Sequence, residues 1–531
     1  MEFRSPFPDV TIPDAPLFDA LFGGLSAEDL ARTAIIDTVT AEELSYAELV
    51  SRIEAVAGAL AARGIAPHDV VALHAPNSAA FAAAFHGILR AGATATTVNV
   101  LYTPADIEAQ LRNSGAKLLL TVSPLLAAAR AAAAAVGLGD AEIIVLDGAE
   151  GFASLADLLG ERRAAPEVSI DAATHLAVLP YSSGTTGVAK GVMLSHRNVV
   201  ANVSQIAELT GVVPADRLLA ILPFFHIYGM TILLNLAFVN RATLVTMPKF
   251  ELGQFLATIE RHRCTYLFIA PPIAVALAKH PAVDGADLSS VHSILSGAAP
   301  LDGAVADAVA ARLGCRVTQG YGMTEMSPVA TLTPFGDDRL PSSSAGVVIP
   351  NMRCRLIDTA TGASIPVPET GTSAPGELQC AGPNVMLGYL GNDAATREAF
   401  TADGFLRTGD IATVSANGGV QVVDRVKELI KYKGYQVAPA ELEALLLTHP
   451  EIADAAVIGA HDADGEEIPK AFVVAQPGSS LSEEQVIAFV AERVSPHKKI
   501  RRVEFLDAIP KSSTGKIFRK DLRGREAAAS R

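Results

Sequence analysis

The stretch Tyr181-Ser-Ser-Gly-Thr-Thr-Gly-Val-Ala-Lys-Gly191 gathers serines, threonines, glycines and one lysine directly after the apolar run Leu176–Pro180. Glycine lets a backbone approach a ligand closely, and successive N–H groups together with hydroxyls form a concavity that binds anions. The stretch therefore indicates a phosphate-binding loop at the end of a strand. It matches neither of the common glycine-rich nucleotide fingerprints, and by itself it is equally typical of a polar surface turn.

The composition is that of a multidomain protein with a well-buried interior. At 531 residues the chain exceeds what one core usually holds, so two or more domains are expected. Half of the residues are hydrophobic and 19% are charged, as in ordinary globular proteins. The formal net charge of −15 argues against nucleic acid and against a membrane surface as partners. A bound polyphosphate would need local cations or a metal ion to overcome this charge.

Four cysteines, Cys264, Cys315, Cys354 and Cys380, lie far apart in the sequence without a Cys-x-x-Cys pair. This spacing favours reduced thiols in a cytoplasmic protein over a disulfide framework or a zinc site. The N-terminus has no signal-peptide pattern, and the longest apolar stretch, residues 228–239, is too short to span a bilayer.

Short apolar strands alternate with helical segments from about residue 34 to residue 320. Strand-like segments are followed by helix-like ones such as Ser78–Arg90. The expected strands are Val70–His74, Ala93–Val98, Leu218–Leu222, Ala242–Met247, Tyr266–Ala270 and Ser293–Ser296. This alternation predicts an α/β fold with parallel sheets covered by helices, in which ligands bind beyond the carboxyl ends of the strands. Both residues 182–186 and residues 319–325 follow expected strands.

The composition and pattern of the sequence change twice after Gly346. First come short strands with Gly and Pro turns, which predict a small β-rich subdomain. From about Val426 the chain becomes lysine-rich, and Pro439 suits the first position of a helix. We therefore expect a large N-terminal domain, residues 1–424, and a small mobile α+β C-terminal domain, residues 425–531, without an internal repeat.

Seven motifs resolve the ambiguity of the opening stretch. They are Tyr181–Gly191, Pro223–Tyr228, Ser296–Pro300, Gln319–Glu325, Arg407–Asp410, Val423–Glu441 and Pro510–Lys516. In this order and spacing the chain resembles the adenylate-forming superfamily of acyl-CoA synthetases, luciferases and adenylation domains, and most of all the 4-coumarate:CoA ligases. The resemblance extends over essentially the whole chain.

The resemblance implies a two-step reaction. A carboxylate attacks the α-phosphorus of ATP to give acyl-AMP and pyrophosphate, and the CoA thiol then displaces AMP to give a thioester. Joining two anions requires that their charge be screened, so positioning and electrostatics carry most of the catalysis. ATP and CoA would be co-substrates, Mg²⁺ the cofactor and a small carboxylic acid the remaining partner.

The family motifs place the ATP site residue by residue. The resemblance implies that the phosphates and the nucleoside contact Ser182, Ser183, Gly184, Thr185, Thr186, Lys190, Gln319, Gly320, Tyr321, Thr324, Asp410, Arg425 and Lys516. Within this set Thr324 would face the α-phosphate, and Asp410 with Arg425 would hold the ribose. Glu325 would hold Mg²⁺. Without the resemblance, each of these charged residues would be taken for part of a surface salt bridge.

Lys516 would bring its ammonium to the α-phosphate and the carboxylate during the first step, although charge counting alone makes it one more cation in a basic tail. The small domain is expected to rotate between the two steps about Lys427. In the second pose Lys433 and Gly434 would approach CoA, together with Lys249 of the large domain. Lys433 and Lys249 are otherwise typical of solvated loops.

The expected acid pocket is almost entirely apolar. The resemblance assigns to it, and to contacts with the acyl-adenylate, Tyr228, Ile232, Leu295, Ala298, Gly322, Pro328, Val329, Leu332, Lys427, Lys431 and Gln436. His226 would orient the carboxylate, whereas a lone histidine among aromatic residues is more commonly part of a core. The apolar residues are equally typical of core packing.

The absence of an acidic residue from Phe224–Leu234 makes amino acids poor substrates, because a buried ammonium would have no partner. A para-hydroxyl on the ring would meet only Tyr228 or water, since Ile232 and Leu295 stand where the plant coumarate enzymes often carry polar residues. Leaving a hydroxyl unpaired costs about 1–3 kcal/mol. We therefore expect cinnamate to be used at least as well as 4-coumarate or caffeate.

Three alternatives remain beside a cinnamate-type ligase. An apolar tunnel also suits a medium- or long-chain fatty acid. An acyl-AMP ligase could load a carrier protein instead of CoA, although Lys249 and Lys433 speak against this. An inactive nucleotide-binding protein would be expected to have lost Lys516, Glu325 or Asp410, and the chain retains them. The sequence leaves the oligomeric state open.

Overall fold

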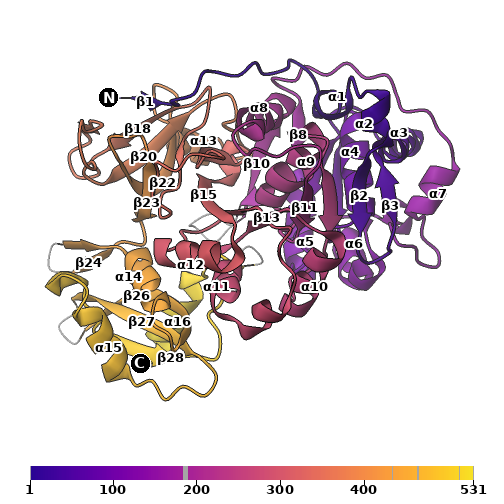
Figure 1. Ribbon diagram of the computed structural model, residues 1–531. Coiled ribbons are helices and arrows are strands. Elements are labelled where there is room, and N and C mark those ends of the chain that lie inside the picture. The colour runs from indigo at the N-terminus through magenta and orange to yellow at the C-terminus, as the bar shows by residue number, and fades with distance from the viewer. Residues whose placement is uncertain (1, 183–188, 433–434, 463–465, 513–514, 530–531) are drawn as a thin grey trace.

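The computed structural model describes residues 2–182, 189–432, 435–462, 466–512 and 515–529. Two large sheets, a smaller third sheet and a separate C-terminal unit make up the molecule (Figure 1). The fold is α/β, as the sequence predicts. Among the described residues, no helix is long and apolar enough to cross a membrane.

The largest sheet has nine strands and is parallel from β2 to β15. Its strands, in spatial order, are β17 (Val347–Val348), β16 (Val329–Leu332), β15 (Arg316–Gly322), β14 (Ser293–Ser296), β13 (Tyr266–Ile269), β11 (Arg217–Ala220), β12 (Thr243–Thr246), β2 (Thr33–Asp37) and β3 (Glu43–Ser45). The second sheet has eight strands: β21 (Gly388–Tyr389), β10 (Lys190–Ser195), β8 (Leu176–Val178), β5 (Thr94–Thr97), β4 (Val70–His74), β6 (Leu118–Thr121) and β7 (Ile143–Val145), with β9 (Tyr181–Ser182) on β10.

Helices cover both sheets (Figure 1). The longer ones are α3 (Tyr46–Ala62), α4 (Ala79–Arg90), α5 (Pro104–Ser114), α6 (Leu126–Ala135), α8 (His196–Ala207), α10 (Leu252–His262), α11 (Pro271–Lys279) and α12 (Gly303–Leu313). The shorter ones are α1 (Leu17–Phe22), α2 (Ala27–Ala31), α7 (Leu155–Gly160), α9 (Leu236–Val239) and α13 (Asp393–Ala399). Local chemistry sets their starts: Ser78 accepts from the Phe81 N–H as the cap of α4. The residues of α4 from Ala79 to Leu89, except Ala80, are buried, as expected of a helix that is apolar all round.

The third sheet is the β-rich subdomain that the Gly and Pro turns predict. It contains β1 (Phe3–Arg4), β18 (Arg353–Ile357), β20 (Gly376–Ala381), β22 (Leu406–Val414) and β23 (Val420–Arg425), with β19 (Ser364–Ile365) on β18. Its pairings are antiparallel. Because β1 pairs with β18, the N-terminal end of the chain is joined to a segment about 350 residues away.

The C-terminal unit has its own core. It comprises β24 (Ile430–Tyr432), β25 (Tyr435–Val437), β26 (Ile452–His461), β27 (Glu467–Ala475), β28 (Arg502–Phe505), α14 (Pro439–Leu447), α15 (Glu483–Ala491) and α16 (Arg519–Ala529). The hydrophobic cluster of the large unit runs as far as Val420, and a separate cluster begins at Ile430. Pro439 is the first residue of α14, as predicted.

Two expectations about the motifs need correction. Gln319–Gly322 do not follow a strand but belong to β15, because Gly320 pairs with Leu332 in the antiparallel strand β16. Tyr181–Ser182 likewise form a strand of their own, β9, which pairs with Lys190 and Gly191 at the start of β10. In both places an antiparallel partner prolongs regular structure where the sequence indicates a loop.

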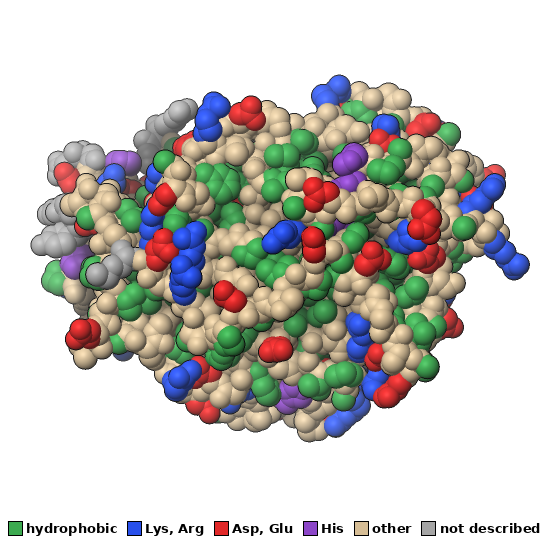
Figure 2. All heavy atoms as spheres, turned by 90° about the horizontal axis from the view of Figure 1, so that it is seen from above, with side chains coloured by type: hydrophobic (Ala, Val, Ile, Leu, Met, Phe, Trp, Pro, Cys, Tyr) green, Lys and Arg blue, Asp and Glu red, His purple; other side chains and the backbone are tan. Residues whose placement is uncertain are grey.

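Acidic and basic side chains are interspersed with apolar ones on the face in Figure 2.

Candidate active site

Glu325 lies buried where three segments meet. It sits in a single helical turn, η5 (Thr324–Met326), directly after β15, and 6% of its surface is exposed. Its carboxylate accepts from the Ser182 hydroxyl at 3.2 Å and from the Tyr389 hydroxyl at 2.9 Å. Because these bonds share one oxygen, Oε1, the other oxygen of the carboxylate keeps its lone pairs for a further partner.

The pairing of β9 with β10 sets Lys190 directly opposite Ser182. The Lys190 ammonium lies 4.9 Å from the centre of the Tyr389 ring, within the range of a cation–π contact. A cation and a buried carboxylate thus face the same tyrosine. The neighbouring predicted phosphate contacts Ser183, Gly184, Thr185 and Thr186 lie outside the described residues.

Asp410 forms a second polar cluster with Tyr321 and Arg425. The Tyr321 hydroxyl donates to Asp410 Oδ2 at 2.6 Å, and Arg425 Nε lies 3.2 Å from Asp410 Oδ1. Burial and the neighbouring carboxylate raise the pKa of the Tyr321 hydroxyl well above its usual value, so it stays a donor. The arrangement presents a buried carboxylate between two donors from different strands.

Lys516 reaches these clusters from the C-terminal unit. Lys511 and Ile517 form an antiparallel bridge. Lys516 therefore lies at the end of the turn that connects them. The Lys516 side chain keeps solvent contact, yet protein surrounds it on most sides, and this desolvation lowers its pKa to about 8. The nearby guanidinium of Arg425 lowers the pKa further, whereas Asp410 and Glu325 act in the opposite direction. Lys516 is therefore within electrostatic reach of both clusters.

His226 is held in a defined hydrogen-bonding state. Its Nδ1 accepts from the Tyr228 N–H at 3.2 Å, which leaves the Nε2–H of a neutral ring to donate. Burial lowers the pKa of His226 to about 4, and the positive charge of Lys516 contributes in the same direction. His226 is therefore a neutral donor at physiological pH, close to the Lys516 ammonium.

The helical segment after His226 is unusual in its geometry. Gly229–Asn235, within the apolar run that is too short to span a bilayer, form a π-helix, η3. π-Helical turns in proteins are frequent at functional sites. Ile232, one of the expected pocket residues, lies in this segment and is buried.

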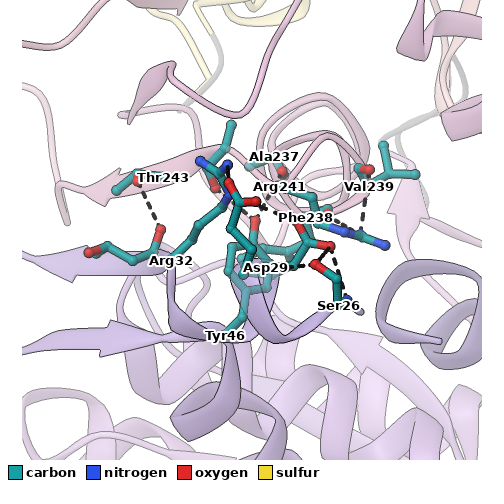
Figure 3. Close-up of polar contacts among 12 residues, drawn as sticks. Ser26, Asp29, Arg32, Tyr46, Ala237, Phe238, Val239, Arg241 and Thr243 are labelled. Carbon is teal, nitrogen blue, oxygen red and sulfur yellow. Dashed lines mark hydrogen bonds and ion pairs between the residues drawn. The ribbon is translucent and has the colours of Figure 1, made fainter. Parts of the chain in front are cut away.

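Three polar interactions fix the far end of this segment, as Figure 3 shows. The Tyr46 hydroxyl donates to the carbonyls of Ala237 and Ala242, at 3.3 and 2.8 Å. Arg241 Nη1 donates to the Phe238 carbonyl at 2.7 Å. Ala237 and Phe238 belong to α9, which follows the π-helix without a break, and Ala242 lies just beyond it, so the wall that carries Ile232 is anchored to the rest of the large unit.

Tyr228 packs against the carboxyl ends of β13 and β14, two central strands of the nine-stranded sheet. Its hydroxyl lies 3.4 Å from the carbonyls of Ile269 and Leu295, and a Cβ atom on Gly297 would come within 2.9 Å of the tyrosine ring. Glycine is therefore required at 297 for Tyr228 to sit here. Ala298 follows with φ of 72°, a left-handed conformation that is strained for alanine and clusters at functional sites.

The remaining wall residues come from β14, β15 and β16. Leu295, Val329 and Leu332 are at most 3% exposed. Gly322 pairs with Val329 so closely that a Cβ would lie 2.2 Å from the Pro328 carbonyl oxygen. The sequence-predicted apolar wall is thus assembled from neighbouring strands beside the Ala298 loop.

Gln319 has a different environment from the other expected nucleotide contacts. Its amide donates to the carbonyls of Leu301 and Ser342, and its oxygen accepts from the Leu301 N–H. Both of its N–H donors are therefore committed to protein. The side chain positions the loop after Ala298, and Gly320 continues β15 toward Tyr321 and Thr324.

Comparison with known proteins matches both the large unit and the C-terminal unit to the same enzyme family. Residues 26–390 match the family described as AMP-binding enzyme, and residues 441–516 match the AMP-binding enzyme C-terminal domain. 4-Coumarate–CoA ligase 5 of Oryza sativa subsp. japonica is 42% identical over 539 residues, which cover 99% of this chain and 97% of that protein.

The chain belongs to the AMP-binding enzyme family. Two solved structures share its whole architecture. ATP-bound MatB from Rhodopseudomonas palustris is 30% identical, with a TM-score of 0.87 over 97% of this chain and 99% of that one. The anthranilate CoA ligase AuaEII, bound to anthranoyl-AMP, is 26% identical, with a TM-score of 0.89 over 98% of this chain and 99% of that one.

Of the residues expected to serve the second step in this AMP-binding enzyme, the structure describes Lys249, Lys427 and Lys431. Lys249 and Lys427 are solvent-exposed, and Lys433 and Gly434 lie outside the described residues. Lys431 is paired with Gln436 in the β24–β25 hairpin, and its N–H donates to Glu467 of the same unit. Figure 1 places β24 at the outer edge of the C-terminal unit. In this pose the small unit brings Lys516 to the site.

Sequence analysis missed Tyr389, which links Glu325 to Lys190. It reaches the site because β21 pairs with β10 and sets Tyr389 opposite Val192. These two strands are almost 200 residues apart in the chain. No local pattern marks such a pairing, so only the fold reveals this residue.

A hollow of about 430 Å³ lies beside β15, between the end of α12 and the loop after β16. Asp307, Arg316 and Ser342 line it, and Gln319 is the one predicted site residue among its lining residues. The charged groups of both units converge elsewhere, at Glu325, Asp410 and Lys516.

Proposed function

We propose that this AMP-forming acid–CoA ligase acts on cinnamate-type acids. It activates the carboxylic acid with ATP to acyl-AMP, releasing pyrophosphate, and transfers the acyl group to the CoA sulfur, releasing AMP. The observation that carries the proposal is the convergence of Lys516 on the Asp410 and Glu325 clusters, beside an apolar wall of buried side chains.

In the first step the protein screens negative charge. Lys516 lies between the carboxylate of the acid and the α-phosphate, where its ammonium stabilises the charge that develops as the new P–O bond forms and the bond to pyrophosphate breaks. His226 donates from Nε2 to the carboxylate of the acid and orients it. Thr324 faces the α-phosphate, and Ser182 and Lys190 face the outgoing pyrophosphate with the rest of the phosphate loop. Asp410 and Arg425 hold the ribose.

Glu325 suits a magnesium ion that is shared with ATP. Among the described residues there is no cluster of three or more metal-binding side chains, and Mg²⁺ is commonly held by one or two carboxylates together with substrate phosphates. The carboxylate of Glu325 has one oxygen not used by Ser182 or Tyr389. When bound, the metal supplies positive charge to the phosphates.

The acid pocket favours an unsubstituted aromatic ring. Tyr228 directs its hydroxyl toward two carbonyls, and Ile232 and Leu295 offer no polar group. The π-helix also contains Thr231 and Asn235, whose side chains are buried with polar atoms that lack a partner among the described residues. If the enzyme strongly preferred a hydroxylated ring, Thr231 and Asn235 would be the candidate hydrogen-bond partners of the ring hydroxyl.

For the second step we propose that the small domain, residues 425–531, rotates about Lys427 against residues 1–424. Lys249, Lys433 and Gly434 would then meet CoA, while Lys431 and Gln436 contact the acyl-adenylate. The two separate hydrophobic clusters support this division. Four buried cysteines, none of them in a disulfide, support a cytoplasmic location.

The test is a thioester assay with ATP and Mg²⁺, run with and without CoA on cinnamate, 4-coumarate, caffeate, benzoate, octanoate and palmitate. We expect the cinnamates to lead, and thioester to form only with CoA. If octanoate or palmitate led, the enzyme would be a fatty acyl-CoA ligase. Acyl-AMP that accumulates without becoming thioester would identify a ligase that loads a carrier protein.

A further inference from the structure

Helix α14 of the small domain is held at both ends by side chains of the large domain. At its start, the Ala440 N–H donates to Asp424 Oδ2 at 2.9 Å. At its end, the Lys279 ammonium donates to the Leu447 carbonyl at 2.7 Å, with the His449 carbonyl 3.4 Å away. Asp424 belongs to β23 and Lys279 is the last residue of α11. Two distant parts of the large domain therefore form hydrogen bonds with the two ends of one helix.

The signs of these two charges suit the two ends of a helix. The first N–H groups of a helix and its last carbonyls have no partner within the helix, and the ends carry partial positive and negative charge respectively. A carboxylate at the start and an ammonium at the end satisfy both. Ala438, at the N-cap position, supplies no side-chain cap of its own, so Asp424 takes over that role from another domain.

Helix α11 also touches the turn that carries the catalytic lysine. A Cβ atom placed on Gly515 would lie 3.4 Å from the side chain of Pro272, in the first turn of α11. One end of α11 thus supports the Lys516 turn, and its other end holds α14 through Lys279. Figure 1 shows α11 on the side of the large domain that faces the small one.

We propose that Lys279 and Asp424 form a latch that holds the small domain in the pose for acyl-AMP formation. The proposal rests on the function proposed above, because a rotation for the second step would separate α14 from α11 and break the Lys279 contacts. Lys279 is thus a positioning residue that acts through the placement of Lys516. The latch sets how the enzyme divides its time between the two half-reactions.

The expected consequence is a change in populations. Removing the Lys279 ammonium weakens only the first pose, so the equilibrium shifts toward open and second-step poses. For Lys279→Ala we expect acyl-AMP formation to fall about fivefold, the lower end of typical coupling between two states. Thioester formation from supplied acyl-AMP should stay constant or rise, since it does not use the first pose.

The experiment measures both half-reactions separately in wild type, Lys279→Ala, Lys279→Arg and Lys117→Ala. Arginine keeps a donor at the end of α14 and should restore most of the first half-reaction. Lys117 is a matched control, because it is a large-domain lysine that pairs with Asp69 at 2.6 Å. Its removal should change neither half-reaction. Equal losses of both half-reactions in Lys279→Ala, or no loss of the first, would overturn the latch.

Amide hydrogen exchange gives a readout that does not depend on the substrate. We expect faster exchange in Lys279→Ala than in wild type at the last turn of α14 and around Gly515 and Lys516. Exchange within α4, in the interior of the large domain, should not change. Unchanged exchange at α14 would contradict the latch even if no tested acid were turned over, whereas wild type that forms no acyl-AMP would contradict the proposed function alone.

Discussion

Arg425 lies directly across from Asp410 on the paired strands β23 and β22, with Arg425 Nε 3.2 Å from Asp410 Oδ1. Asp410 is 4% exposed and also accepts from the Tyr321 hydroxyl. The buried carboxylate is therefore fixed by a donor on each side. Because Arg425 begins the predicted small domain, the expected ribose site stands at the junction between the two domains.

Asp410→Ala should weaken the use of ATP. Hydrogen bonds to charged groups contribute about 1.5–3 kcal/mol, so kcat/KM for ATP in acyl-AMP formation should fall about 10- to 100-fold. Thioester formation from supplied acyl-AMP should also weaken, since the nucleotide is still held there. The matched control Tyr321→Phe keeps the carboxylate and should cost less. An unchanged KM for ATP in Asp410→Ala would contradict the ribose assignment.

Glu325→Gln should raise the magnesium requirement. The substitution keeps an oxygen that can accept from Ser182 and Tyr389 but removes the negative charge that a hard cation prefers. We expect the Mg²⁺ concentration for half-maximal rate to rise about tenfold or more, within the range for losing a charge-assisted contact. Tyr389→Phe removes one hydrogen bond without changing the charge, and should shift the magnesium curve far less. If the rate depended on Mg²⁺ concentration identically in Glu325→Gln and Tyr389→Phe, the assignment of Glu325 to the metal site would be wrong.

Ile232→Ser should change the choice of acid. A hydroxyl at this buried position gives a para-hydroxyl on the substrate ring a partner, and an unpaired hydroxyl costs about 1–3 kcal/mol. The ratio of kcat/KM for 4-coumarate to that for cinnamate should therefore rise about fivefold or more. The control Ile232→Val keeps the wall apolar and should leave the ratio unchanged. A wild-type enzyme with a large preference for caffeate would contradict the pocket as described.

The rate of acyl-AMP formation should fall at alkaline pH. Desolvation lowers the pKa of Lys516 to about 8 in the free enzyme. The protonated form is the one that screens the two anions, so kcat/KM for the first half-reaction should decline above about pH 8, by tenfold per pH unit. Lys516→Arg retains its charge at all these pH values and should lose this decline. The same alkaline decline in wild type and Lys516→Arg would assign the titration to another group.

Protonation of His226 should not lower the rate of acyl-AMP formation near neutral pH. Its pKa is lowered to about 4 by burial and by Lys516, so the ring is already neutral above pH 5. The first half-reaction in wild type should therefore be flat between about pH 5.5 and 7. His226→Ala should lower the rate by about 100- to 1,000-fold, in the range for one positioned hydrogen-bond donor, without adding a decline in rate at acidic pH. A step near pH 6.5 that disappears in His226→Ala would contradict the neutral donor.

The parts that follow local rules were accessible from the sequence. The strands Val70–His74 and Ser293–Ser296 have the predicted bounds, the expected helix from Ser78 to Arg90 is present with Ser78 as its cap, and Pro439 is the first residue of its helix as predicted. The family motifs named Asp410, Arg425 and Lys516, and the structure brings these three together.

What the sequence could not reveal depends on contacts between distant segments. Tyr389 enters the site through a pairing of β21 with β10. The Gln319 amide donates to the carbonyls of Leu301 and Ser342. Lys279 reads in the sequence as an ordinary cation near the end of a helix. Its partners are carbonyls of another helix nearly 170 residues away, so its role emerges only when both helices are placed.

The measurement that tests the central claim most directly compares the two half-reactions in Lys516→Ala. Acyl-AMP formation from acid and ATP is followed by pyrophosphate release, and thioester formation is started from supplied acyl-AMP and CoA. We predict a loss of about 100-fold or more in the first half-reaction, as for removal of a group that stabilises developing charge, with the second largely retained. Equal loss of both half-reactions would contradict the assignment of Lys516 to acyl-AMP formation and the rotation of the small domain between the two steps.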